Sequence, residues 1–319
     1  MNRRRYVFHV ILGILILALP LIFSSTYARH ILVSSGIFTL LCLGLNLTMG
    51  YTGQTPFGYP VFFGLGAYTT AIGFTYLGTN FWHGLIAAPV LAGIFGFLIG
   101  YPSLRLRGPY FAIVTLAFAE IVGLILNNWV SFTRGSMGIP GIPSPKIVIP
   151  GLIDFTFNQE LKWYYLVAAI CAFYLLVNRS LVRSYVGEAW LAIRENEDLA
   201  EAVGVHTFKW KMMAFVVGAM MGGMAGCVYA HYYNIVSPDL VGFYYITTTF
   251  AMVIIGGRGT LLGPVLGAIL FTAVPEYLRA AKTMRLVLFG VIMLLGIIFM
   301  PQGLNGLITD IRGRLPRRK

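Results

Sequence analysis

The chain has 319 residues, of which 58% are hydrophobic and only 11% are charged, and its formal net charge is +12. Soluble globular domains carry about a quarter charged residues, so this composition excludes an ordinary soluble domain and indicates a membrane protein. In a membrane protein, basic loops that face the cytoplasm explain the positive charge better than nucleic-acid binding does.

Apolar runs close to the ~20 residues that a membrane-crossing helix needs recur along the whole sequence. We therefore predict an all-α, polytopic membrane helix bundle, formed as a single transmembrane domain over residues 1–319. We expect eight to ten spans, because segments rich in Gly and Pro can interrupt some of them. The candidate spans are residues 7–23, 31–49, 57–77, 84–101, 109–127, 162–178, 212–233, 242–256, 260–277 and 286–300.

Basic residues orient these spans. If Arg3, Arg4 and Arg5 keep the amino terminus in the cytoplasm, most of the 23 Lys and Arg residues fall in cytoplasmic segments, as the positive-inside rule requires. Both termini are then cytoplasmic. The first apolar segment also has the basic start, apolar middle and small residues near Ala28 of a cleavable signal peptide, which is the alternative to an uncleaved first helix.

Two segments rich in glycine, residues 52–66 and 256–267, interrupt the apolar pattern, and both contain proline. Irregular backbone is tolerated at membrane depth only beside protein or a water-filled cavity, so we expect both segments to line a translocation path. Close helix packing through small residues is the alternative explanation for the glycines. The residues expected at the path are Gln54, Pro56, Gly256 and Gly257.

Glu120 lies in the middle of the span 109–127. An ionised carboxylate costs several kcal/mol there and is retained where it faces a bundle interior, a partner or water. We expect Glu120 either to act in the path as a gating residue or to pair with a neighbouring helix and fix the packing. A position at the outer interface fits less well, because two helical turns separate Glu120 from Asn127.

The sequence contains no pattern that predicts catalysis, a metal site or a nucleotide site. The five histidines form no His-x-x-x-His pair, and Cys42, Cys171 and Cys227 stand singly in apolar runs. Without a Gly-Lys dipeptide the chain lacks the phosphate-binding loop Gly-x-x-x-x-Gly-Lys-Ser/Thr. We expect no enzyme activity, no metal and no cofactor in this chain, so any ATP is bound by a partner.

Residues 187–211 carry five of the 11 acidic residues and are too polar to cross a membrane. The abundance of Ala, Leu and Glu predicts a single amphipathic helix over residues 188–203, lying under the membrane and ended by Gly204 in the left-handed conformation. The alternative is a solvated connector whose charges only keep it out of the bilayer.

Seven motifs then resemble one known family, in the same order: GLNLTMGYTGQ, FFGLGAYT, RLRGPYFAIVTLAFAEIV, TRGSMGIPGIP, IRENEDLAEAVGV, GGRGTLLGPVLGA and MPQGLNGL. The chain resembles the permease subunits of branched-chain amino acid ABC importers, a family that also includes urea and amide importers. The resemblance implies a bacterial inner-membrane importer. It would consist of two related permeases, two cytoplasmic ATP-binding subunits and an extracytoplasmic substrate-binding protein, with no nucleic acid.

The family also suggests which residues act. Residues 200–205, AEAVGV, resemble the loop by which such permeases dock on their ATPases, although a later Leu-Pro of the fuller pattern is missing. We expect coupling within residues 179–211, with small residues at the tightest contact and charges, including Glu197 far out, at the rim. The outer loop, residues 128–161, is expected to touch the binding protein. The expected coupling residues are Arg194, Glu201, Ala202 and Gly204.

Residues 55–60 depart from the small residues that family members usually have after Gly-Gln. The substrate is therefore expected to be a branched-chain amino acid or a related small amide or carboxylate. An ion-coupled secondary transporter that uses Glu120 is the leading alternative, and a membrane-embedded enzyme is the third class.

Overall fold

The computed structural model describes residues 19–20, 25–149, 153–157 and 159–277, together with residues 290, 294, 303 and 304. Every structural statement below concerns this part of the chain. The predicted spans 7–23 and 286–300 and the basic carboxyl-terminal tail fall almost wholly outside it. The location of the termini therefore stays a prediction.

Helices dominate the described part, and eight of them match the eight central spans predicted from hydropathy. Five are long and apolar enough to cross a membrane: Thr26–Tyr51, Phe81–Ser103, Pro109–Asn128, Glu160–Val182 and Thr207–Tyr233. These findings confirm a polytopic helical membrane protein. The eight helices are α2 (Thr26–Asn46, continued by the π-helix η1, Leu47–Tyr51), α3 (Pro60–Leu77), α4 (Phe81–Ser103), α5 (Pro109–Asn128), α7 (Glu160–Val182), α10 (Thr207–Tyr233), α11 (Phe243–Gly257) and α12 (Gly263–Tyr277).

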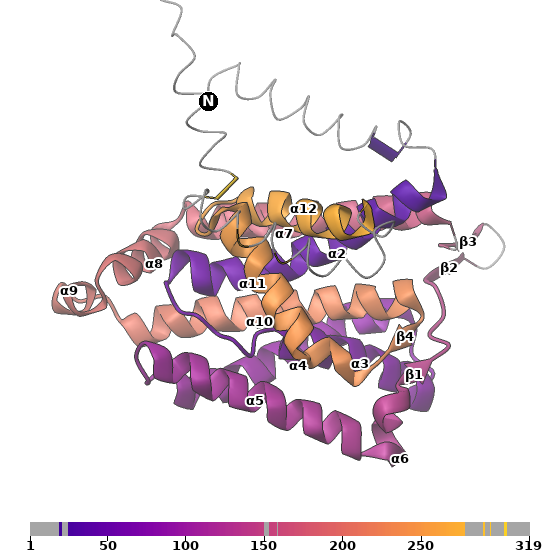
Figure 1. Cartoon of the computed structure of the whole chain (residues 1–319), viewed down its shortest axis with the longest axis horizontal. Coiled ribbons are helices and arrows are strands. Elements are labelled where there is room, and N and C mark those ends of the chain that lie inside the picture. The colour runs from indigo at the N-terminus through magenta and orange to yellow at the C-terminus, as the bar shows by residue number, and fades with distance from the viewer. Residues whose placement is uncertain are drawn as a thin grey trace, which may run out of the picture.

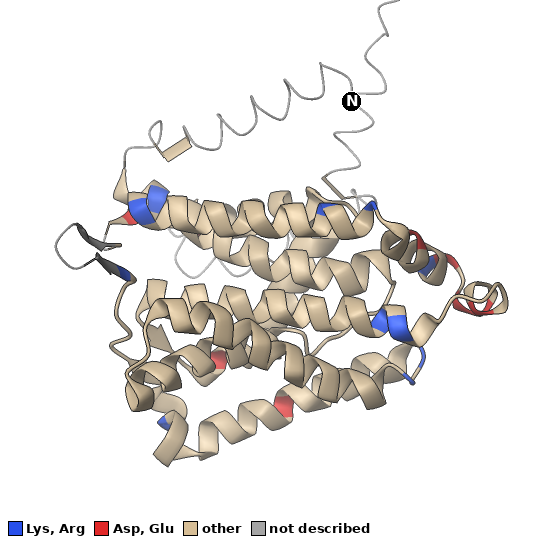
Figure 2. Cartoon of the chain, turned by 180° about the vertical axis from the view of Figure 1, so that it is seen from behind, with Lys and Arg blue, Asp and Glu red and all other residues tan. Residues whose placement is uncertain are grey.

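The bundle has two distinct ends (Figure 1). One end carries the short helices α8 (Tyr185–Glu195) and α9 (Glu197–Ala202), and we call it the α8–α9 end. The other end carries the strands β1 to β4 and the single-turn helix α6 (Val130–Thr133), and we call it the strand end. Charged residues gather mainly at these two ends, whereas the helical middle is largely uncharged (Figure 2). This distribution fits a molecule whose middle lies in hydrocarbon.

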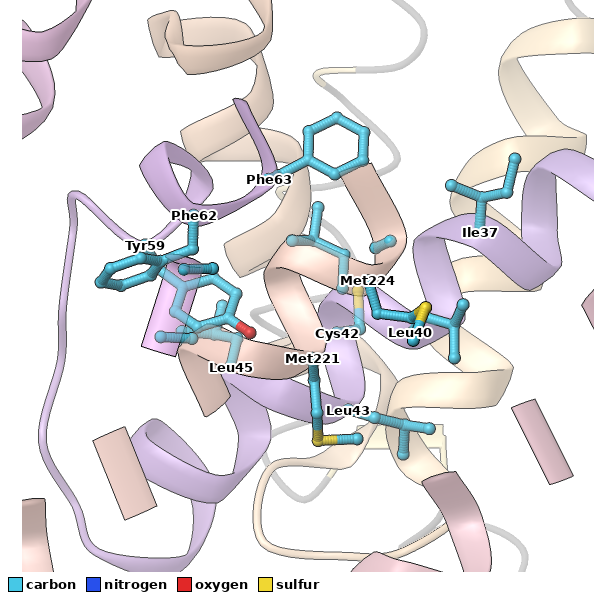
Figure 3. Close-up of a cluster of buried hydrophobic side chains, with 14 of the residues drawn as sticks. Ile37, Leu40, Cys42, Leu43, Leu45, Tyr59, Phe62, Phe63, Met221 and Met224 are labelled. Atoms are coloured by element: carbon cyan, nitrogen blue, oxygen red, sulfur yellow. The ribbon is translucent and has the colours of Figure 1, made fainter. Parts of the chain in front are cut away.

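Helix α10 forms the centre of the bundle, where α2, α3 and α4 pack against it. Its small residues permit this approach: a Cβ on Gly223 would lie 2.5 Å from Ala92 Cβ of α4, and one on Gly66 of α3 would lie 2.1 Å from the Gly223 carbonyl oxygen. Met221 and Met224 of α10 fill the space next to Cys42 of α2 (Figure 3). Because hydrocarbon offers no hydrophobic drive between helices, such close packing is what holds them together.

Short strands, which the all-helical prediction did not include, form within residues 139–156, and one of them pairs with a strand that follows α10. Strand β1 (Ile139–Pro140) pairs antiparallel with β4 (Ile235–Val236), which directly follows α10. Strands β2 (Lys146–Ile149) and β3 (Ile153–Thr156) form an antiparallel hairpin. Two 3₁₀ turns, η2 (Gly135–Met137) and η3 (Pro238–Val241), complete the described elements.

Candidate functional site

The acidic segment folds as two helices, so the single helix predicted over residues 188–203 is wrong. The break is at Asn196, whose φ of −158° and ψ of 110° are extended. Its side-chain oxygen accepts a hydrogen bond from the Leu199 backbone N–H at 3.0 Å and caps α9. Asn is among the strongest N-cap residues, and Glu197 and Asp198 follow it in the first turn, where negative charge is favourable. These local signals outweigh the high helix propensity of the segment as a whole.

The inner face of α8 is packed onto the bundle through aromatic and aliphatic side chains. Trp190 is fully buried, and its indole N–H donates to the Trp210 carbonyl oxygen of α10 at 2.8 Å. Ala189 and Ile193 are buried beside it. Helix α8 is therefore joined to α10 as part of the folded core, which a merely solvated connector would not be.

Two ion pairs hold α9 against the bundle. Glu197 lies 2.6 Å from the ammonium of Lys211 on α10, and that lysine side chain is only 3% exposed. Asp198 lies 2.6 Å from the guanidinium of Arg107, between α4 and α5. This hydrogen bond with Asp198, and the nearby negative charges, raise the pKa of Arg107. The Glu197 carboxylate thus neutralises a buried cation that would otherwise lack a counter-charge, and its expected position on the rim of a docking surface stays a prediction.

The opposite face of α9 is open to solvent and apolar. Leu199 is 65% exposed and Val203 is 80% exposed. Glu201, Ala202 and Gly204 are exposed beside them, so the structure brings together three of the four predicted coupling residues. We call these five residues, Leu199 and Glu201 to Gly204, the α9 patch. The predicted left-handed conformation of Gly204 is confirmed, with φ at +88° and open space around the position of a Cβ.

Arg194, the fourth predicted coupling residue, points elsewhere. Its Nη1 donates to the carbonyl oxygen of Gly50, inside η1, at 2.8 Å. A Cβ on Gly259, in the turn between α11 and α12, would lie 2.4 Å from the same Nη1. Arg194 thus extends from α8 to the place where η1 and this turn meet.

Asn46, the last residue of α2, joins the start of η1 to the turn between α11 and α12. Its side-chain amide donates to the Thr260 carbonyl oxygen at 2.9 Å and accepts from the Gly259 N–H at 2.8 Å. We call this meeting point, formed by Asn46, Gly50, Arg194, Gly259 and Thr260, the junction. Sequence reasoning did not single out Asn46, although its polar side chain near the end of an apolar span was a usable signal.

The first glycine-rich segment is unwound. After η1, residues 52–59 leave the helical conformation, and α3 starts only at Pro60. The segment runs from Gly53, which packs on Arg194, to Gly58, which packs on the Thr115 carbonyl oxygen of α5. Gln54 is half-buried and Pro56 is buried. The unwinding predicted here is confirmed.

The second glycine-rich segment is a tight helical hairpin. Helix α11 ends at Gly257, α12 begins at Gly263, and Gly256 and Gly257 are buried. A Cβ on Gly256 would lie 2.1 Å from the Gly263 carbonyl oxygen, and one on Gly267 would lie 1.8 Å from the Met252 carbonyl oxygen. The alternative of close helix packing therefore describes this segment.

Glu120 is exposed on the surface of α5. Apolar residues surround it there, including Ile121 at 54% and Leu124 at 60% exposure. In the described part of the chain Glu120 has no hydrogen-bonding or ion-pair partner. The expectation of an ion pair with a neighbouring helix therefore has no counterpart among the described residues, and the carboxylate faces out from the bundle.

The comparisons with known proteins agree on one family. The sequence model of the family described as branched-chain amino acid transport system / permease component matches residues 27–299 of this chain. A high-affinity branched-chain amino acid transport system permease protein LivM of Escherichia coli K12 is 35% identical over 288 residues, covering 84% of this chain and 67% of that protein. A probable LivM of Methanocaldococcus jannaschii is 27% identical, covering 86% and 92%.

A second kind of permease in the same transport systems is also related. The permease protein LivH of Salmonella typhimurium is 23% identical over 286 residues, covering 84% of this chain and 91% of that protein. No solved structure matches. These relatives are named as transport permeases and not as enzymes. The chain belongs to the family of branched-chain amino acid transport permease components.

Proposed function

We propose that this chain is one of two related permeases of an ATP-driven importer for branched-chain amino acids or a related small amide or carboxylate. The importer lies in the bacterial inner membrane, with both termini and the α8–α9 end in the cytoplasm. Two cytoplasmic subunits bind the ATP, and an extracytoplasmic binding protein delivers the substrate to the outer loop. The names of the LivM and LivH relatives support the substrate class and the second permease. No observation favours the ion-coupled alternative.

The α9 patch carries the proposal for ATPase docking. One side of α9 faces the bundle through the buried Ala200 and the pairing of Glu197 with the buried Lys211, so Leu199 and Val203 face away from the bundle. Two large apolar side chains that are held outward next to Glu201 have the composition of a docking patch with an apolar centre and a polar rim. Ala202 and Gly204 allow a partner backbone to approach closely.

The junction carries the proposal for coupling. Arg194 lies on the same short helix pair that docks the ATPases, and it is hydrogen-bonded to η1, from which the unwound segment continues. A shift of α8 therefore moves the start of that segment directly. We propose that residues 52–59, with Gln54 and Pro56, line the path, and that Gly256 and Gly257 form its wall at the junction.

The exposed face of α5 is the proposed meeting surface with the second permease. A carboxylate within hydrocarbon needs a partner or water, and the described part of this chain supplies no partner for Glu120. The second permease would supply that partner or enclose water with α5. Cysteines placed at Ile121 and on the second permease should form a disulfide, whereas no cross-link to any such site would contradict this arrangement.

The docking proposal is tested by Gly204→Val. At φ +88° a β-branched residue costs on the order of 1–2 kcal/mol and reshapes the end of α9, so the variant should insert in the membrane but lose most of its bound ATPase and its uptake. The measurements are pull-down of the ATPase subunits and uptake of labelled leucine in vesicles.

Gly78→Val is the matched control. Gly78 also has positive φ, at +64°, and open space around its Cβ position, but it ends α3 far from α9. We expect this variant to retain its ATPases. Normal ATPase binding and uptake by Gly204→Val would contradict docking through the α9 patch.

A further inference from the structure

The end of α4 and the start of α10 meet at the α8–α9 end, where basic side chains gather (Figure 2). Residues 104–108 and 207–211 contribute four cations, Arg105, Arg107, Lys209 and Lys211. Arg107 and Lys211 form the two ion pairs with α9 described above. Arg105 and Lys209 are exposed, and neither has a carboxylate partner in the described part of the chain. These two cations are therefore available to an anion that is not part of the bundle.

Aromatic rings hold both of these cations in place. The guanidinium carbon of Arg105 lies 4.5 Å from the centroid of the Tyr101 ring and 5.9 Å from that of Phe208. Lys209 follows Phe208 on α10, and its ammonium lies 5.5 Å from the centroid of the Trp210 ring. A cation on the face of a ring is attracted to it but keeps its charge and most of its N–H donors. The rings thus order the two cations without neutralising them.

Both cations lie at the depth of the lipid headgroups. The apolar span of α4 ends at Ser103, and that of α10 begins at Thr207. Arg105 is two residues beyond the first limit, and Lys209 is in the first turn after the second. Trp and Tyr side chains favour this boundary between hydrocarbon and water, and they are the residues found beside the two cations here. The anion nearest to this position in a membrane is a lipid phosphate.

Two stripes of apolar side chains run from the cations toward the middle of the bundle. They consist of Ile94, Phe97 and Tyr101 on α4, which are exposed, and of Met213, Val216 and Met220 on α10, which are half-buried. The stripes border one helix contact, since a Cβ on Gly93 of α4 would lie 2.8 Å from Met220 Cγ and 3.8 Å from Val216 Cγ1. From Lys209 to Met220 α10 rises about 16 Å, which is about the depth of one leaflet of hydrocarbon. We call the two stripes, with Arg105 and Lys209, the α4–α10 surface.

This surface matches the two parts of an anionic phospholipid. We propose that it binds one such lipid, phosphatidylglycerol, with the phosphate at Arg105 and Lys209 and an acyl chain along the two stripes. Guanidinium and ammonium groups form charge-assisted hydrogen bonds with phosphate. Phosphatidylcholine has the same phosphate, but it also carries a quaternary ammonium that the two cations repel. Charge complementarity therefore selects the anionic lipid, and the inference holds whatever substrate the protein carries.

The first test compares two lipids on the complete transporter in vesicles. Phosphatidylglycerol with a photoactivatable diazirine in one acyl chain should label residues 94–101 and 213–220 of this chain, as mapped by mass spectrometry of its peptides. Phosphatidylcholine with the same acyl chains should label these residues less, by on the order of tenfold. Equal labelling by the two lipids would overturn the headgroup assignment.

The second test removes the two cations. Arg105→Gln combined with Lys209→Gln should lower labelling by phosphatidylglycerol to the level seen with phosphatidylcholine. Both side chains are exposed, so the double variant should be recovered in the membrane. Arg183→Gln is the matched control, because Arg183 is an exposed arginine at the end of α7 and lies outside the α4–α10 surface. Unchanged labelling of the double variant would overturn the proposal.

Two protein subunits are the alternative occupants of this surface. If the second permease covers it, phosphatidylglycerol will not label residues 94–101 and 213–220 in the complete transporter, and the lipid site is overturned. If the ATPases use the two cations, the double variant will lose its bound ATPase in a pull-down and keep its lipid labelling, which also overturns the lipid site. Retained ATPase together with reduced lipid labelling is the result that we expect.

Discussion

The two glycine-rich segments look alike in sequence and fold differently. Residues 52–59 are unwound between η1 and α3, whereas the turn after Gly257 joins two helices that pack backbone to backbone. The first segment contains Pro56 and a polar amide, Gln54, whereas the proline of the second, Pro264, lies in the first turn of α12, where its missing N–H breaks no helical hydrogen bond. Proline inside the connecting segment thus marks a break in the helix, whereas proline at a helix start is compatible with the close approach of two backbones through glycine.

The largest effect is expected for Gly267→Val, because no space exists for a side chain in the hairpin. A Cβ there would lie 1.8 Å from the Met252 carbonyl oxygen, so α11 and α12 must separate. We expect a loss of more than about 3 kcal/mol of stability, seen as failure to recover monodisperse protein in detergent. Gly123→Val is the control, because nothing lies within 4 Å of a Cβ at Gly123 on α5. Recovery of Gly267→Val at the control level would show that the α11–α12 hairpin is not closely packed and that the two glycine-rich segments do not differ in this respect.

Arg194→Gln should give the next largest effect, because Arg194 of α8 contacts both η1, from which the first segment continues, and Gly259 in the second segment. The shorter, uncharged side chain loses the hydrogen bond to Gly50. Uptake should fall on the order of tenfold, as expected for about 1.4 kcal/mol of lost coupling, while the ATPases stay bound and continue to hydrolyse ATP. The loss of coupling is measured as an increase in the ratio of ATP hydrolysed to leucine imported.

Arg183→Gln provides the comparison for Arg194→Gln. Arg183 is an exposed arginine at the end of α7, near α8 but outside the junction. It should leave the ratio unchanged. Loss of bound ATPase in Arg194→Gln would instead return this residue to the docking surface where the sequence placed it.

The smallest effect is expected for Gln54→Leu, which alters the unwound segment without filling a packed space. Removing the amide should reduce uptake severalfold and leave ATPase binding intact. Thr55→Val, at the neighbouring half-buried position, is the control. Normal uptake by Gln54→Leu would remove that amide from the proposed path and leave the segment with a purely structural role.

Much of the fold follows from hydropathy, because each span is a long local signal. Eight predicted spans coincide with described helices to within a few residues, as at 109–127 against Pro109–Asn128. The outer strands escaped prediction because β1 and β4 have two residues each and pair across a long stretch of chain. Such pairing depends on tertiary structure and leaves no period in the sequence.

The candidate site was predicted only in part, because some of its features are local to the sequence and others depend on tertiary contacts. The positive φ of Gly204 is a local property and was predictable. The helix break at Asn196 was also encoded locally, in an Asn followed by two acidic residues, but the propensity of the whole segment concealed it. The partners of Glu197 and Arg194 were not predictable, since Lys211 and Gly50 come to them from other elements.

Helix α10 has a mechanical consequence that follows from its uninterrupted length. Its 27 residues extend about 40 Å, the thickness of a whole bilayer with its headgroups. Near its start α10 contacts Trp190 and Glu197, and just beyond its last turn lie β4 and Asn234, whose carbonyl oxygen accepts a hydrogen bond from the Gly141 N–H. One continuous helix therefore joins the α8–α9 end to the strand end, and a tilt of α10 would move both ends together.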